Sequence, residues 1–149
     1  MKINWIYKPF NELSLIELYD ILVLRQEVFV IEQDWPYLDA DGKDLKSHHL
    51  MGYNDENELV AYLRLVMSGV SYKEPSLGRI VTSLKYRGTG LGKELMKKSL
   101  EKVTEQFGHV PLRISAQCYL EKFYECFGFQ PTGKEYLEDG IPHIEMLRS

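Results

Sequence analysis

The sequence has little cysteine: Cys118 and Cys126 are the only two in 149 residues. Eight positions apart in an expected helix, they would be separated by roughly 12 Å along its axis, which is too far for a disulfide. They also lack the CxxC spacing that zinc sites and redox centres use. We therefore expect two reduced thiols, as in a cytoplasmic protein, and no metal site.

The sequence also lacks a charge-free apolar run that could cross a membrane. Its most apolar segment, residues 13–31, carries four charged side chains: Glu17, Asp20, Arg25 and Glu27. Residues 1–7 lack the basic, apolar and small-residue order of an export signal. Lysines and arginines are scattered in a chain of net charge −4, which disfavours a nucleic-acid surface. We expect a cytoplasmic protein that binds neither membranes nor nucleic acid, and homodimer formation is left open.

The composition is sufficient for one folded domain over residues 1–149. Hydrophobic residues make up 44% of the chain and aromatic residues 12%, which is ample for a buried core at this length. No repeat or low-complexity tract interrupts the chain. We therefore expect a single domain.

A helix is predicted to begin after Ser14, because Ser14 and Glu17 have the spacing of a capping box. Its expected apolar face is defined by periodic residues: Leu15, Leu18, Ile21, Leu22, Val28 and Phe29. The helix should end near Glu32 and Gln33. A long polar loop is predicted from 33 to 47, and loops of that length are often functional.

The remaining pattern alternates strands with two further helices. Strands are expected at residues 3–7, 48–53, 59–67, 77–82, 110–116, 129–137 and 143–147, and helices at 91–107 and 119–127. Turn-forming residues at 54–57 and 138–140 predict two β-hairpins.

The segment 86–95, YRGTGLGKEL, places Gly88, Gly90 and Gly92 at alternate positions directly before a helix. Successive N–H groups in such a loop converge on an anion, and the positive end of the helix dipole adds to the attraction. The loop is therefore predicted to bind phosphate. Three glycines would be entropically costly in a simple turn that nothing approaches.

Spacing argues against two common phosphate ligands. A nucleoside-triphosphate loop needs Gly and Ser or Thr at the positions that Arg87 and Glu94 occupy. A dinucleotide fingerprint needs a third glycine where Lys93 stands. The aspartates of residues 39–44 do not form a calcium loop either, because glycine is not sixth and glutamate is not twelfth.

The remaining pattern, Arg-x-x-Gly-x-Gly followed later by the segment 116–129, AQCYLEKFYECFGF, resembles the GCN5-related N-acetyltransferases. Segments 25–33, 36–44 and 138–144 look like the ElaA-like bacterial subgroup. The resemblance spans the chain and implies an α+β fold, a mixed and mostly antiparallel central sheet flanked by helices. It also implies acetyl-CoA as co-substrate.

The resemblance further implies roles for individual residues. Backbone N–H groups at Arg79, Ile80 and Val81 would polarise the thioester carbonyl. The loop Arg87, Gly88, Thr89, Gly90, Leu91 and Gly92 would hold the pyrophosphate, and Gln117, where many members carry Asn, would contact the pantetheine arm. Tyr124 matches the general acid of the family, and its alternative is a core aromatic.

The base that deprotonates the amine is less determined, because any nearby carboxylate or imidazole can serve through water. The candidates are Glu32, Asp41, His48, His143 and Glu145, and the subgroup match favours His143. The acceptor is expected between Phe29, Glu32, the loop carboxylate Asp41 and the terminal hairpin. The alternative is a loop that only covers the sheet.

Two functions remain after these steps. The first is an N-acetyltransferase that transfers the acetyl group of acetyl-CoA to a primary amine of a small molecule or a protein. The second is an acyl-CoA-binding sensor without turnover, in which Tyr124 is only packed. The sequence does not name the acceptor.

Overall fold

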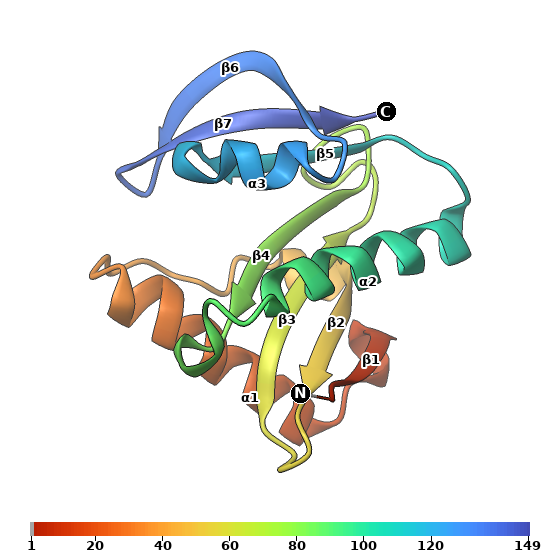
Figure 1. Cartoon of the computed structure of the whole chain (residues 1–149), viewed down its shortest axis with the longest axis vertical. Helices are drawn as coiled ribbons and strands as arrows, with labels where there is room; N and C mark the ends of the chain where they lie inside the picture. The colour runs from red at the N-terminus through yellow and green to blue at the C-terminus, as the bar shows by residue number, and fades with distance from the viewer. Residues whose placement is uncertain (1) are drawn as a thin grey trace.

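The computed structural model describes residues 2–149 (Figure 1). The strands are β1 Asn4–Pro9, β2 Ser47–Tyr53, β3 Leu59–Val66, β4 Ser76–Thr82, β5 Leu112–Gln117, β6 Gln130–Glu138 and β7 Ile141–Arg148. The helices are α1 Leu15–Arg25, α2 Leu91–Phe107 and α3 Glu121–Glu125. A π-helical segment, η2 Gln26–Glu32, continues α1, and short 3-10 turns are η1 Phe10–Glu12, η3 Lys43–Lys46, η4 Leu84–Tyr86 and η5 Cys118–Leu120.

The strands form two antiparallel sheets, ordered β1-β2-β3-β4 and β5-β7-β6. The sheets meet where the backbone N–H of Arg113 donates to the carbonyl of Pro75 at 3.1 Å. Figure 1 shows the three-stranded sheet above the four-stranded one. The expected α+β class is confirmed, with the central sheet divided in two.

Two helices cover opposite faces of the four-stranded sheet. Neighbouring residues of a strand point to opposite faces, and Leu50 and Met51 of β2 belong to different buried clusters. Leu50 packs in the cluster with Leu95 of α2, and Met51 in the cluster with Ile21 of α1. Burying each such side chain contributes roughly 1.5–3 kcal/mol.

The start and end of the first helix are as predicted. The backbone N–H of Glu17 donates to Ser14 Oγ at 3.0 Å, and the Ser14 N–H donates to the Glu17 carboxylate at 2.8 Å. The helical path ends at Glu32. No helix within residues 2–149 is long and apolar enough to cross a membrane.

The predicted apolar face of α1 is wrong at its first residue. Ile21 and Val28 are buried as expected, but Leu15 is 86% exposed. The helix is apolar on nearly every side, so hydrophobicity alone does not identify the buried one. The face that meets the sheet is centred on Ile21, Leu24 and Val28, and it also buries Arg25.

The terminal hairpin predicted from residues 138–140 is present, and its turn has two residues, 139 and 140. Glu138 pairs with Ile141, and both turn residues have positive φ: 52° at Asp139 and 74° at Gly140. Aspartate and glycine tolerate this conformation, which matches the twist of paired strands. The helix expected at 119–127 is shorter, because residues 118–120 form a 3-10 turn before α3.

Candidate active site

The glycine loop before α2 has a backbone that other residues would adopt only with strain. Gly88 has φ of 78° and Gly90 has φ of 85°. A Cβ at either position would meet no atom within 4 Å, so the backbone there is open. Among residues 2–149, no side chain caps α2, which begins at Leu91. The first N–H groups of the helix are therefore available to an anion.

A cavity of about 720 Å³ lies against this loop, and we call it the loop cavity. Of the loop residues singled out from the sequence, five line it: Arg87, Gly88, Gly90, Leu91 and Gly92. Thr89 does not, because its hydroxyl turns back to donate to the Tyr86 carbonyl.

Arg87 and Glu32 form an ion pair at the edge of the loop cavity. Both guanidinium Nη atoms donate to the carboxylate, Nη2 at 2.7 Å, and this contact raises the pKa of Arg87. Glu32 therefore lies beside the glycine loop. Phe29, one turn earlier in η2, lines the loop cavity and also the second cavity described below.

Strand β4 carries a bulge at the residues expected to face the thioester. The register with β3 shifts between Tyr62 and Arg64, so Arg79 and Ile80 together lie opposite Leu63. Arg79 has φ of 47°, a left-handed conformation. A bulge interrupts the hydrogen-bond ladder and leaves backbone groups unpaired. Val81, the third residue expected here, lines the loop cavity.

A second cavity, of about 470 Å³, lies between the loop of residues 33–42 and the β6–β7 hairpin, and we call it the hairpin cavity. The two cavities adjoin, because they share six lining residues: Phe29, Gln33, Ile80, Gln117, Leu120 and Ile141. The bulge residue Ile80 and Gln117, the last residue of β5, are thus at the junction.

Tyr124 lines the hairpin cavity. Its side chain is 5% exposed, and burial raises the pKa of its hydroxyl. Its ring packs edge-on against Phe123 and Phe129. Within residues 2–149 the hydroxyl makes no hydrogen bond, so its proton is available to a group that enters the cavity.

His143 lies opposite Gln117 in the β5–β7 register and also lines the hairpin cavity. Its Nδ1 is 2.7 Å from the Ile141 carbonyl, which assigns the proton of the neutral ring to Nδ1. The ring stacks on Tyr136 at 6.3 Å. Nε2 therefore carries the lone pair, and a Glu138 carboxylate oxygen is 3.3 Å from it.

The other candidates for the base are engaged elsewhere. Glu145 accepts from Arg113 at 2.9 Å, and His48 stacks on Tyr7. Neither of them lines either cavity, and Glu32 borders the loop cavity in its ion pair. Asp41 lines the hairpin cavity, but its carboxylate is paired with Arg64 and Arg79.

The three loop carboxylates are matched by three arginines that come from α1, β3 and β4. The pairs are Arg25 with Asp39 at 2.8 Å and Asp44 at 2.7 Å, Arg64 with Asp41 at 2.7 Å and Asp44 at 2.9 Å, and Arg79 with Asp39 at 2.9 Å and Asp41 at 3.4 Å. We call these six residues the carboxylate–arginine network. Burial alone would raise the pKa of Asp41, but hydrogen bonds and charge from Arg64 hold it well below its usual range.

In this network the arginines balance the charge of the loop carboxylates. The Arg79 side chain also holds the loop, because its Nη2 donates to the Asp39 carbonyl at 3.1 Å. Sequence reasoning missed Arg64 and the partners of Arg25, because no sequence signal pairs residues 14 to 40 positions apart.

The loop and the hairpin touch at one side of the hairpin cavity. The Trp35 ring lies so close to Gly140 that a Cβ there would come within 3.0 Å. Glycine at this turn position therefore allows the two walls of the cavity to meet. Within residues 2–149, no group of three or more histidine, cysteine or acidic side chains could hold a metal ion, and Cys118 and Cys126 are both free.

The profile of the acetyltransferase (GNAT) domain matches residues 37–149. The chain belongs to the GNAT acetyltransferase family, and its fold is that of an acyl-CoA N-acyltransferase. Within that family it is an ElaA-like member.

Three relatives cover nearly the whole chain. Protein ElaA of Escherichia coli is 43% identical over 98% of this chain and 96% of its own length, and its crystal structure superposes with a TM-score of 0.92 over 99% and 100%. An acyl-CoA N-acyltransferase from Pseudomonas aeruginosa superposes with a TM-score of 0.94 at 42% identity, over 99% of this chain and 100% of the other. The UPF0039 protein sll0451 of Synechocystis is 44% identical over 99% and 96%.

Proposed function

We propose that this acyltransferase transfers the acetyl group of acetyl-CoA to a primary amine by direct attack of the amine on the thioester. The observation that carries the proposal is the junction of the two cavities at Ile80 and Gln117. One cavity lies on a backbone suited to phosphate, and the other holds an acid and a base. A donor and an acceptor can thus enter from different sides and meet.

The glycine loop would hold the pyrophosphate of acetyl-CoA through its backbone, with Leu91 at the positive end of α2. The 720 Å³ volume of the loop cavity is in the range of cofactor sites. Gln117 and the β4 bulge would then contact the pantetheine arm and the thioester. The ladder is interrupted at Arg79 and Ile80. Backbone N–H groups at Arg79, Ile80 and Val81 would donate to the carbonyl oxygen as negative charge develops there.

His143 would act as the base. Nε2 takes a proton from the acceptor ammonium, and the Glu138 carboxylate stabilises the resulting imidazolium. Glu138 is 47% exposed, so the proton can pass on to solvent. The neutral amine nitrogen then forms its bond to the carbonyl carbon, and the proton that this nitrogen loses as the amide forms passes to solvent.

Tyr124 would act as the acid. As the carbon–sulfur bond breaks, the thiolate takes the hydroxyl proton, and the phenolate recovers a proton from solvent. Burial raises the pKa of this hydroxyl, so it stays protonated until the thiolate forms. Without a protein partner, the hydroxyl can turn toward the sulfur.

We place the acceptor in the hairpin cavity. Phe29 would border the amine where the two cavities meet. Asp41 would act indirectly, through the arginines that it holds. Glu32 would sit at the edge of the loop cavity and exchange its contact with Arg87 when acetyl-CoA binds.

The test is release of free coenzyme A thiol when purified protein is offered acetyl-CoA with a panel of amines. The expected result is release that depends on one class of amine, with the acetylated nitrogen identified by mass spectrometry. Binding of acetyl-CoA without release from any amine would favour the sensor. An acetylated hydroxyl product would overturn the amine assignment.

A further inference from the structure

The wall of the hairpin cavity formed by η3 and β4 has unpaired positive charge. The ammonium of Lys43 makes no hydrogen bond or ion pair within residues 2–149, and Nη1 of Arg79 makes no hydrogen bond there; both residues line the cavity. The Arg79 guanidinium lies over the Tyr37 ring at 5.7 Å. With Lys43 included, four cations face the three carboxylates of the carboxylate–arginine network. One positive charge is left over on this side.

Within residues 2–149, two guanidinium N–H groups lack an acceptor, one from β4 in this wall and one from the neighbouring strand β3. Nε of Arg64 is buried without a hydrogen bond, and the Arg64 side chain is only 5% exposed. Nε of Arg79 is 2.9 Å from an Asp39 oxygen, but its N–H does not point at that oxygen. A buried donor without an acceptor is costly, so native proteins keep few of them. Both nitrogens are buried, so an anion in the cavity would contact Lys43 and Nη1 of Arg79 and not these two groups.

The wall formed by the hairpin has the opposite charge. Asp139 forms no ion pair within residues 2–149, and among those residues the only ionisable nitrogen within 4 Å of the Glu138 carboxylate is Nε2 of His143, at 3.3 Å. Both acidic residues line the cavity together with His143. The cavity is therefore negative near the base and positive on the side of Lys43 and Arg79.

We infer that the acceptor is a zwitterionic small molecule, a free amino acid whose carboxylate binds at Lys43 and Arg79 while its amine faces His143. The inference rests on the proposed function for the transfer step and adds the substrate class. A volume of about 470 Å³ accommodates a molecule of this size. Asp41 is then a positioning residue, because it holds Arg64 and Arg79 in the wall.

The experiment compares matched acceptors with acetyl-CoA: the twenty amino acids, their decarboxylated amines and their primary amides. The expected result is that at least one amino acid exceeds its decarboxylated amine and its amide by about tenfold to a hundredfold in kcat/KM, the value of one charge-assisted contact. Equal or better turnover of the decarboxylated amines would overturn the inference while leaving the proposed transfer intact. Dipeptides are tested as further acceptors, to distinguish an enzyme that acts on free amino acids from one that acts on the terminal amine of a peptide.

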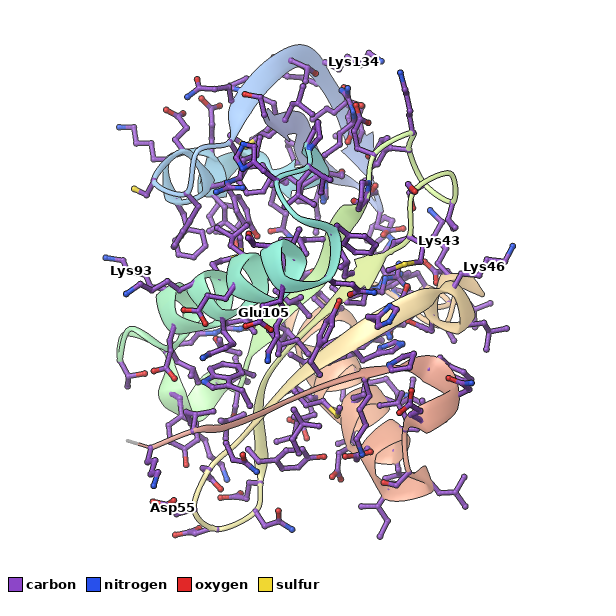
Figure 2. The ribbon with its side chains drawn as sticks, turned by 90° about the vertical axis from the view of Figure 1, so that its right-hand side faces the viewer. Lys43, Lys46, Asp55, Lys93, Glu105 and Lys134 are labelled. Atoms are coloured by element: carbon purple, nitrogen blue, oxygen red, sulfur yellow. The ribbon has the colours of Figure 1, made fainter. Side chains whose placement is uncertain are left out.

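Lys43→Gln is the decisive variant, because Lys43 holds no ion pair and its loss should not unfold the protein. It should reduce the preference for the amino acid over its amine about tenfold and leave turnover of the amine unchanged. Lys46→Gln is the matched control, since Lys46 lies on the same 3-10 turn (Figure 2) but is absent from the residues that line the cavity. Equal loss in both variants, or loss in neither, would contradict the carboxylate site.

Calorimetry covers the case in which no amine is turned over. The amino acids and their decarboxylated amines are titrated into the protein saturated with coenzyme A. Binding of an amino acid that Lys43→Gln weakens and Lys46→Gln does not would support the site even if the transfer reaction were wrong. Absence of amino-acid binding in this titration would overturn the inference.

Discussion

Replacing Arg25 with methionine should destabilise the protein more than any surface change. Arg25 is 1% exposed at the end of α1. Its Nε donates to Asp39 at 2.8 Å, its Nη1 to Asp44 at 2.7 Å, and its Nη2 to the Asp39 carbonyl at 3.0 Å. Methionine fills similar apolar space but makes none of these contacts.

The expected loss follows from what the variant leaves behind. Asp44 keeps Arg64 at 2.9 Å, but Asp39 keeps only the Tyr37 hydroxyl at 2.9 Å and the misaligned contact to Arg79. Removing one partner of a buried pair typically costs about 3–5 kcal/mol, because the other charge stays buried. At about 2–4 °C per kcal/mol for a chain of this size, the melting temperature should fall by about 6–20 °C.

Urea unfolding followed by circular dichroism measures this loss, with Lys98→Met as control. Lys98 forms a surface pair with Glu101 at 3.1 Å, and such pairs contribute at most about 1 kcal/mol. The reasoning would be refuted if Arg25→Met lowered the free energy of unfolding by less than about 1 kcal/mol while the slope of that free energy with urea concentration stayed unchanged. The loop would then be held by packing.

Lowering the pH should reduce the difference in free energy of unfolding between wild type and Arg25→Met. Burial would raise the pKa of Asp44, but contacts with Arg25 and Arg64 lower it below its ordinary value. A lowered pKa means that the stabilisation is complete above about pH 4, the unfolded value, and is lost as the pH falls through the folded one. As the pH falls from 7 to 3, the free energy of unfolding should decrease less in Arg25→Met than in wild type.

Three further predictions concern the proposed reaction. Gly90→Val should abolish acetyl-CoA binding measured by calorimetry, whereas Gly69→Ala, at an equally open glycine with φ of 86°, should bind normally; equal affinity in both would remove the loop assignment. Tyr124→Phe should lower kcat roughly a hundredfold with little change in acetyl-CoA affinity, and an unchanged rate from pH 6 to 10 would leave Tyr124 as packing. His143→Gln should lower kcat most near pH 7 and least near pH 10, where the amine is already neutral; a loss independent of pH would argue against a base.

The glycine loop and the first helix could be predicted because their signals are local. Positive φ at Gly88 and Gly90 and the capping box at Ser14 depend only on near neighbours in the chain. Tyr124 and His143 were reached through the family resemblance, and the structure places both in one cavity. Their roles in the reaction stay predictions.

Other features of the site depend on contacts between distant segments. Whether Asp41 is a free charge depends on Arg64, 23 positions away, and the sequence does not show that pair. The bulge at Arg79 is a mismatch between two strands, so neither strand reveals it alone. Lys43 can be identified as an unpaired charge only after the structure shows that arginines pair with the carboxylates around it.

The network also explains why the base is better sought on the hairpin than on the loop. For Asp41 to take a proton from an ammonium, it would have to give up its hydrogen bonds to Arg64 while Asp44 remained buried beside the same guanidinium. The lowered pKa of Asp41 measures how strongly the charged form is held, and a carboxylate so held is a weak base. Nε2 of His143 has no guanidinium partner and has a carboxylate 3.3 Å away. In the proposed reaction the two walls therefore have separate tasks: the wall with Lys43 and Arg79 would position the acceptor, and the hairpin wall would move the proton.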